Sequence, residues 1–194
     1  MTSTPTPARR RRVPAIERRD ALIEAAVREF AHSGLYGTPV ERIARRVGVA
    51  QPYVFSLFGD KRELFLAAVE RGFRTVEELF TDAAQTFDPA IAEPGTDVLS
   101  AMGQAYVEML STRREHLMLQ HQAYAACDDE VIRETVRRAY AHLVEHVREL
   151  SGADSERLDE FFRYGMWLNV AAAMGVEDLS AGCEWMRVER AEAP

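Results

Sequence analysis

The stretch from Thr38 to Phe55 constrains the fold of this chain more tightly than any other part of its sequence. Its first half places four apolar residues at the spacing of one helical face. Gly48 then supplies the backbone freedom that a tight turn between two crossing helices needs. A second short helix should run from about Gln51 to Leu57, with Val54 and Phe58 turned inward. The pattern therefore predicts a helix-turn-helix. The apolar residues of its first helix are Val40, Ile43, Ala44 and Val47.

Helices are predicted on both sides of this unit. An amphipathic helix should begin at Ile16 and end at Ser33-Gly34, because glycine favours helix termination. Thr38 is expected to cap the next helix through a reciprocal hydrogen-bonding pair with Glu41. A similar pair within 60–63 should open a long helix. The inward stripe of that long helix is predicted to be Phe65, Val69, Phe73, Val76, Phe80 and Ala83.

The remainder of the chain shows helical spacing and no strand pattern or internal repeat. Proline and acidic residues predict a loop over 86–95. Further helices are predicted near 97–114, 116–126, 130–150 and 155–175. We therefore expect an all-α protein in three parts. These are a disordered basic arm over 1–14, a three-helix DNA-binding domain with the helix-turn-helix over 15–62, and a helical domain over 63–194.

Positive charge is concentrated near the amino terminus of a chain whose formal net charge is −7. Residues 1–62 hold 12 Lys and Arg against 6 Asp and Glu, a net charge of +6, and the remainder holds 12 against 25, a net charge of −13. A basic module that faces phosphates, joined to an acidic module, produces this asymmetry. The two widely spaced cysteines are typical of free thiols, and no apolar run reaches the roughly 18 residues of a membrane span. We therefore expect a cytoplasmic protein without a membrane partner.

The motifs from Leu22 to Phe65 resemble the DNA-binding domain of the TetR family of transcriptional repressors. The matching residues are Ile43-Ala44, Gly48-Val49, Phe55-Ser56-Leu57-Phe58, Lys61 and Leu64. The resemblance implies about nine helices, a carboxy-terminal domain that binds a ligand, and a homodimer formed through the last two long helices. Two positions depart from the family pattern. Phe55 stands where a tyrosine usually binds phosphate, and Ala50 stands where a serine commonly caps the helix.

The start of the second short helix is predicted to read base edges in the major groove of DNA. Gln51 can pair with adenine, whereas Pro52 and Tyr53 can contact a thymine methyl group. Lys61, in the first turn of the long helix, is expected to hold a phosphate. The predicted DNA-binding set is completed by Thr38, Phe55, Ser56, Arg9, Arg10, Arg11 and Arg12.

Two members of this set have a plain alternative explanation. The four-arginine run resembles arms that enter an adjacent minor groove, and a nonspecific solubilising tail explains the same run. Thr38 can contact a phosphate at the start of its helix, or it can simply cap that helix.

Seven residues of the carboxy-terminal region predict an adaptable ligand cavity, because methionine and aromatic side chains with polar tips suit such sites. They are Phe73, Met102, Tyr106, Met109, Met118, His121 and Tyr124. A plain hydrophobic core explains the same stripe.

A broad apolar helix near the carboxy terminus, rich in small residues, predicts a four-helix dimer contact. The predicted contact residues are Phe161, Trp167, Val170, Ala171 and Met174, with Trp185 and Met186 at the edge. The competing explanation is a core helix of a monomer.

Together these features predict a ligand-responsive transcriptional regulator, and specifically a homodimeric repressor that a small apolar molecule releases from a palindromic operator. Its partners would be double-stranded DNA, the effector and a second copy of itself. No enzymatic activity, cofactor or metal is expected, because no nucleophile–base pair, phosphate-cradling loop or complete ligand set is readable. The rival hypothesis is a helical adaptor that binds only protein, which would need neither groove-reading residues nor a cationic arm.

Overall fold

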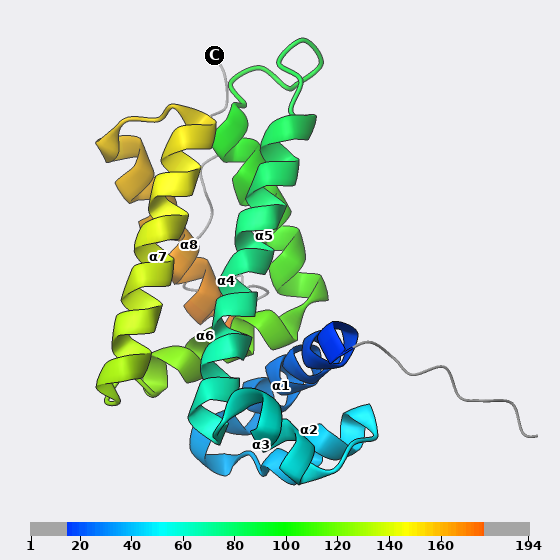
Figure 1. Ribbon diagram of the computed structural model, residues 1–194. Helices are drawn as coiled ribbons and strands as arrows, with labels where there is room; N and C mark the ends of the chain where they lie inside the picture. Colours follow the sequence, from blue (N-terminus) through cyan, green and yellow to red (C-terminus); the bar gives the residue numbers. More distant parts are fainter. Residues whose placement is uncertain (1–14, 177–194) are drawn as a thin grey trace, which may run out of the picture.

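Eight α-helices make up residues 15–176, the part of the chain that the computed structural model describes, and no strand occurs within it (Figure 1). The predicted all-α class is therefore confirmed, with a helix count close to the expected nine. The helices are α1 (Ala15–Gly37), α2 (Val40–Val47), α3 (Gln51–Phe58), α4 (Lys61–Thr86), α5 (Val98–Thr112), α6 (Arg114–Ala125), α7 (Glu130–Ser151) and α8 (Ser155–Met174).

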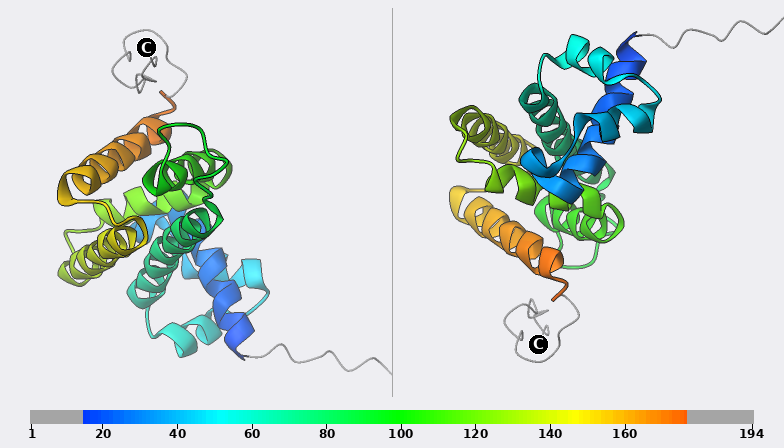
Figure 2. Two further views of the ribbon diagram at one scale, coloured as in Figure 1. Left: turned by 90° about the horizontal axis from the view of Figure 1, so that it is seen from above. Right: turned by 90° about the horizontal axis from the view of Figure 1, so that it is seen from below.

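The helices form two groups that share α4 (Figure 1, Figure 2). At one end of the molecule, α1, α2 and α3 pack around the first turns of α4. At the other end, α5 and α7 flank the rest of α4, and α8 packs against both of them. Helix α6 packs along α1 and also contacts α4 and α5. Both α4 and α6 therefore connect the two groups.

A backbone break at Gly34 interrupts α1 where the sequence predicted its end. Gly34 adopts φ 67° and ψ −178°, a conformation that glycine tolerates because it lacks Cβ. Thr38 then turns inward, and its hydroxyl donates to the backbone oxygens of Glu29 at 3.1 Å and Gly34 at 2.7 Å. The predicted capping pair with Glu41 is wrong, because the Thr38 hydroxyl is already committed to α1. Helix α2 begins after Pro39 without a side-chain cap.

The start of α4 follows the sequence prediction. The Asp60 carboxylate accepts a hydrogen bond from the backbone N–H of Glu63 at 2.9 Å, which satisfies one of the open donors of the first turn. Four residues of the predicted inward stripe are buried, and the other two are half-buried. The buried four are Phe65, Val69, Phe73 and Phe80, and the half-buried two are Val76 and Ala83.

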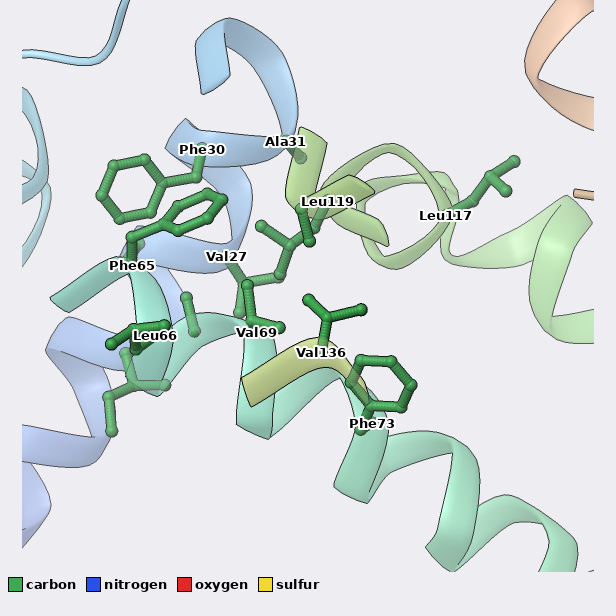
Figure 3. Close-up of a cluster of buried hydrophobic side chains, with 14 of the residues drawn as sticks. Val27, Phe30, Ala31, Phe65, Leu66, Val69, Phe73, Leu117, Leu119 and Val136 are labelled. Atoms are coloured by element: carbon green, nitrogen blue, oxygen red, sulfur yellow. The ribbon is translucent and has the colours of Figure 1, made fainter. Parts of the chain in front are cut away.

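A buried apolar cluster joins the two groups of helices (Figure 3). Phe30 of α1 meets Phe65 of α4 edge to face, with ring centroids 5.0 Å apart. Val69 and Phe73 continue the cluster along α4, toward Leu119 of α6. Because these side chains are removed from water together, burial of apolar surface holds the amino-terminal helices on the rest of the molecule.

The later helices also begin at acidic caps. Asp129 accepts from the N–H groups of Val131 and Ile132 at the start of α7, and Asp154 accepts from that of Arg157 at the start of α8. Carboxylates suit these positions because they also face the positive end of the helix dipole. Among the helices described over 15–176, none combines the length and the apolar character needed to cross a membrane.

Candidate nucleic-acid interface and ligand cavity

Helices α2 and α3 form the predicted helix-turn-helix. Gly48 ends α2 with φ 74°, in the left-handed region that favours glycine. The backbone N–H of Val49 then donates to the Ala44 oxygen at 3.0 Å and closes the turn. Ile43 and Val54 are almost fully buried on the facing sides of the two helices. These inward residues fix which side of α3 faces outward.

The outward side of α3 carries the residues predicted to contact DNA. Gln51 and Pro52 are exposed in its first turn, and Phe55 and Ser56 are exposed one turn later. Tyr53 is half-buried, and its carbonyl accepts a hydrogen bond from the Ser56 hydroxyl at 2.7 Å. The structure thus brings these five residues together on one short helix, with amide, hydroxyl and aromatic groups available at its surface.

Two arginines of α1 lie against α3, and sequence reasoning missed them. The guanidinium carbon of Arg18 lies 5.9 Å from the ring centroid of Tyr53, and that of Arg19 lies 4.6 Å from the ring centroid of Phe58. Cation–π attraction of this kind holds positive charge beside an aromatic face. The sequence did contain the clue, since the run of arginines resumes at positions 18 and 19 within a helix packed on the helix-turn-helix.

Lys61 lies at the amino terminus of α4, close to the corner between α1 and α2. Its Nζ donates to the backbone oxygen of Tyr36 at 3.1 Å, and burial lowers the pKa of Lys61. An ammonium group has three donors, so this contact leaves two for a phosphate. The Tyr36 side chain is 73% exposed at the same corner.

A buried carboxylate pairs with two of the three arginines of α2. Glu29 of α1 is 4% exposed and accepts from Nε and Nη2 of Arg46 at 2.8 and 2.6 Å. Its second oxygen lies 3.5 Å from Arg42 Nη1. Arg45 pairs at the surface with Glu41 at 3.3 Å. The arginines of α2 therefore contribute less unpaired positive charge than their number in the sequence suggests.

One member of the predicted DNA-binding set does not join this surface. Thr38 has no exposed surface, because its side chain fastens α1 to the start of α2. A phosphate contact through its hydroxyl would require that packing to open. Residues 9–12 lie outside the described residues.

Five helices, α4 to α8, line a partly open cavity of about 1020 Å³, at the upper end of the range for small-molecule sites. Three of the seven predicted lining residues contribute to its wall, namely Phe73, Tyr106 and Met109. The other four predicted residues do not line it. Met102 is completely buried in the core, and Met118, His121 and Tyr124 lie outside the cavity wall.

Uncharged polar side chains form a hydrogen-bonded network at this wall. The Tyr106 hydroxyl donates to Asn169 Oδ1 at 2.6 Å, and Asn169 Nδ2 donates to Gln120 Oε1 at 3.2 Å. Gln120 Nε2 in turn donates to the Tyr124 hydroxyl at 2.6 Å. Burial raises the pKa of Tyr106, and that of Tyr124 to about 12, so both hydroxyls stay protonated. Sequence reasoning missed Gln120 and Asn169, because isolated polar residues on apolar helices form no pattern.

The five residues predicted for the dimer contact occupy different environments. Phe161 lines the cavity and packs against Phe80, with ring centroids 5.7 Å apart. Trp167 also lines the cavity, and Ala171 is buried within the chain. Val170 and Met174 are 41% and 58% exposed. Phe161 and Ala171 are therefore core residues of the single chain, because the face of α8 that carries them points toward α5 and the cavity. Positions 185 and 186 lie outside the described residues.

A short helix crossed on another at a glycine turn, with polar and aromatic groups on its outward side, defines the helix-turn-helix class of DNA-binding folds. Residues 22–68 match the family model described as bacterial regulatory proteins, tetR family. The amino-terminal domain of the chain therefore matches the DNA-binding domain of the TetR family, which confirms the resemblance seen in the sequence.

Two curated relatives each align with part of the chain. The HTH-type transcriptional activator FasR of Mycolicibacterium smegmatis is 32% identical over 102 residues, which are 49% of this chain and 46% of that protein. The HTH-type transcriptional repressor SCO4008 of Streptomyces coelicolor is 36% identical over 50 residues, 26% of each protein. The aligned part thus spans less than half the length of these relatives.

Solved structures extend the likeness to the whole fold. A TetR-like transcriptional regulator from Rhodococcus sp. RHA1 has a TM-score of 0.63 and 19% identity, covering 90% of this chain and 94% of that one. A putative transcriptional regulator from Pseudomonas aeruginosa PAO1 has a TM-score of 0.64 and 21% identity, covering 88% of this chain and 84% of that one. At these identities the likeness concerns the arrangement of helices.

Proposed function

We propose that this protein is a ligand-responsive transcriptional regulator, and specifically a homodimeric repressor that leaves a palindromic operator when a small apolar molecule binds. Both the family of its amino-terminal domain and the named regulators that align with part of the chain support a role in controlling transcription. One of those relatives is an activator and the other a repressor. The direction of control is therefore our own proposal.

The observation that carries this proposal is the outward face of α3. A helix laid in the major groove offers the residues of its first turns to base edges, and here those residues are Gln51, Pro52 and Tyr53. The Gln51 amide suits adenine, and the Pro52 ring suits a thymine methyl group. Phe55 and Ser56 lie one turn further on and face the sugar-phosphate backbone in this arrangement.

Positive groups around α3 supply the attraction for phosphates. Arg18 and Arg19 approach it from α1, and Lys61 approaches from α4 with two ammonium donors to spare. Contacts of this kind set the register of a protein on the duplex without reading its sequence. They also make binding weaker at higher salt, because bound counterions are released from the DNA.

The contact between α6 and α1 supports a link from cavity to DNA. Gln120 and Leu119 of α6 line the cavity, whereas Gln122 of the same helix faces Gly34 of α1. The approach is so close that a Cβ on Gly34 would overlap the Gln122 amide. A ligand that shifts α6 would therefore also displace α1, on which the helix-turn-helix is mounted.

A second copy of the chain is proposed to pack on α8. Val170 and Met174 are exposed there one turn apart, and Tyr164, about three turns before Met174 on the same helix, is 37% exposed. Exposed apolar groups on one helix favour association through a twofold contact. Such a dimer would place two α3 helices for two half-sites that are one or more turns of DNA apart.

Selection from random duplexes, followed by gel shifts with the full-length chain, tests the proposal. We expect Gln51→Ala to weaken binding to the selected operator by about 1–3 kcal/mol while leaving random duplex unaffected. Lys61→Ala should weaken binding to both duplexes alike and lower the salt slope by about one. Gln85→Ala, at an exposed position far along α4, is the matched control and should bind like the wild type.

Three results would contradict the proposal. They are a selection that enriches no sequence, full affinity of a monomer for a single half-site, and equal losses by Gln51→Ala on operator and random duplex. The first result would favour the helical adaptor. A reporter gene placed behind the selected operator measures the direction of control, and we expect expression to rise when the gene for this protein is deleted.

A further inference from the structure

We infer that the cavity lined by α4 to α8 takes an uncharged, largely apolar molecule with one hydroxyl group, and that this hydroxyl pairs with Nδ1 of His116. The inference rests on the proposed function, because it specifies the chemistry of the effector for the same cavity. It goes beyond that function by naming the recognising atom and by excluding ionised ligands.

His116 presents an unsatisfied polar atom in the cavity wall. It lies in the first turn of α6 and lines the cavity, and its Nδ1 is buried without a hydrogen-bond partner among residues 15–176. Buried polar atoms are nearly always paired, because an unpaired one loses its bonds to water without replacement. Nδ1 itself is covered, so the imidazole ring would have to turn toward the cavity; a ligand group that then met this atom would gain a hydrogen bond that the chain itself leaves open.

The neighbouring polar groups of the wall already bond to one another. Gln120 lies one turn after His116 on α6, and its amide bonds to Asn169 and Tyr124. The Asn169 oxygen is taken by the Tyr106 hydroxyl at 2.6 Å. A ligand that competed for these groups would have to break bonds within the protein. His116 is accordingly the place where a ligand bond comes without such a loss.

Charged residues meet the cavity only at its exposed rim. Of the three that line it, Arg157 pairs with Asp97 and Arg163 pairs with Asp159. Glu160 is the third, and it too is exposed. An ionised group held deep among the aromatic and aliphatic side chains would lose its hydration without a counter-charge, which is strongly unfavourable. The interior therefore selects neutral molecules.

His116 itself is suited to a neutral partner. Burial lowers its pKa, and the nearby cations Arg113 and Arg28 act in the same direction, against Glu115 and Glu24. A neutral imidazole has one donor nitrogen and one acceptor nitrogen. A hydroxyl can donate or accept, so it fits Nδ1 in either tautomer.

Three probes with ten-carbon chains test the charge preference. 1-Decanol below its solubility limit, and decanoate and decyltrimethylammonium below their micellar concentrations, are titrated into the full-length chain carrying Trp185→Phe. This background leaves Trp167, which lines the cavity, as the single fluorescent tryptophan. We expect the Kd of decanol to be at least about tenfold below that of either ion. Equal or tighter binding of either ion would overturn the inference.

Substitution of His116 tests the recognising atom. We expect His116→Phe to raise the Kd of decanol by about tenfold, because the hydroxyl loses its partner. The melting temperature of the ligand-free chain should stay the same or rise, since the unpaired polar atom is gone. His116→Leu provides a second variant with the same expectation. His142→Phe, at an exposed site on α7, is the matched control and should bind decanol like the wild type.

The inference would be wrong if either His116 variant folded and kept the wild-type affinity for decanol. Failure of the inference is distinguishable from failure of the proposed function, because the three probes are ranked without DNA present. A chain that selects an operator but prefers an ionised probe overturns the inference alone. A chain that prefers decanol but selects no operator overturns the proposed function alone.

Discussion

A charged group is buried at one end of this molecule, and a neutral hydrogen-bonded pair is buried beside the cavity at the other. In the amino-terminal group, the Glu29 carboxylate is buried against the guanidinium of Arg46. In the carboxy-terminal group, Tyr106 and Asn169 are buried as a neutral pair beside a large cavity. An ion pair half open to water keeps cationic side chains fixed at a surface, whereas a neutral network leaves a cavity free of unpaired charge. The difference agrees with the proposed function, in which one end binds DNA and the other binds an apolar molecule.

The largest expected effect tests whether the two ends are separable at all. Phe65→Ala removes the ring that packs on Phe30 between the two groups, and should lower the free energy of unfolding by about 3–5 kcal/mol. We expect urea unfolding followed by tryptophan fluorescence and by circular dichroism to shift together. Ile91→Ala, at an 84% exposed loop position, should change little. A fluorescence transition that stays at the wild-type midpoint would show that the carboxy-terminal group unfolds independently of the amino-terminal group.

A smaller loss is expected from the charged cluster of the amino-terminal end. Glu29→Gln keeps the shape of the side chain but removes the charge that Arg46 and Arg42 share, and should lower the free energy of unfolding by about 1–3 kcal/mol. Glu41→Gln breaks an exposed pair with Arg45 and should lower it by at most about 0.5 kcal/mol. The free energies of unfolding are measured by chemical denaturation. Equal losses in the two variants would show that burial of Glu29 does not increase the stabilisation that its ion pairs provide.

The neutral network of the carboxy-terminal end should respond to Tyr106→Phe. This change leaves Asn169 Oδ1 without its 2.6 Å donor and should lower the free energy of unfolding by about 1–2 kcal/mol. Tyr164→Phe alters a 37% exposed side chain and serves as the control. If Tyr106→Phe were as stable as the wild type, the hydroxyl would not be part of what holds α5 to α8.

The smallest expected effect is a difference in pH dependence. Burial lowers the pKa of His116 from its ordinary value of 6.5, so the unfolded chain binds a proton at this site more readily than the folded one. With respect to this site, the free energy of unfolding is therefore highest above about pH 6.5 and decreases as the pH falls below that value. Between about pH 7.5 and about pH 5.5, the melting temperature of the wild type should therefore fall more than that of His116→Phe. The melting temperature of the control His32→Phe, which changes an exposed residue, should fall as far as that of the wild type.

Much of the amino-terminal end could be predicted from the sequence because its determinants are local. Gly48 and the apolar spacing around it define the turn, and Asp60 defines the start of α4. The misassigned residue there is Thr38, whose hydroxyl bonds to residues four and nine positions earlier. A local capping rule cannot anticipate a side chain that turns toward a preceding helix.

The cavity could be predicted only in part, because its wall is assembled from five helices. Phe73, Tyr106 and Met109 were found from their types, whereas His121 and Tyr124 were assigned to the cavity and lie outside it. A stripe on one helix does not specify which of its members a distant helix covers. The cavity position of Phe161 was missed for the same reason, since its neighbour Phe80 is far away in the sequence.

Helix α4 runs without interruption from Lys61 beside the helix-turn-helix to Thr86 at the opposite end of the molecule. Its 26 residues make a rod about 39 Å long, because each residue advances the helix by about 1.5 Å. Over such a rod, a tilt of about 5° carries one tip through about 3 Å, roughly the spacing of adjacent base pairs. In the proposed dimer, two such helices related by a twofold axis would tilt together and double the change in separation, which would move both α3 helices out of register with successive major grooves.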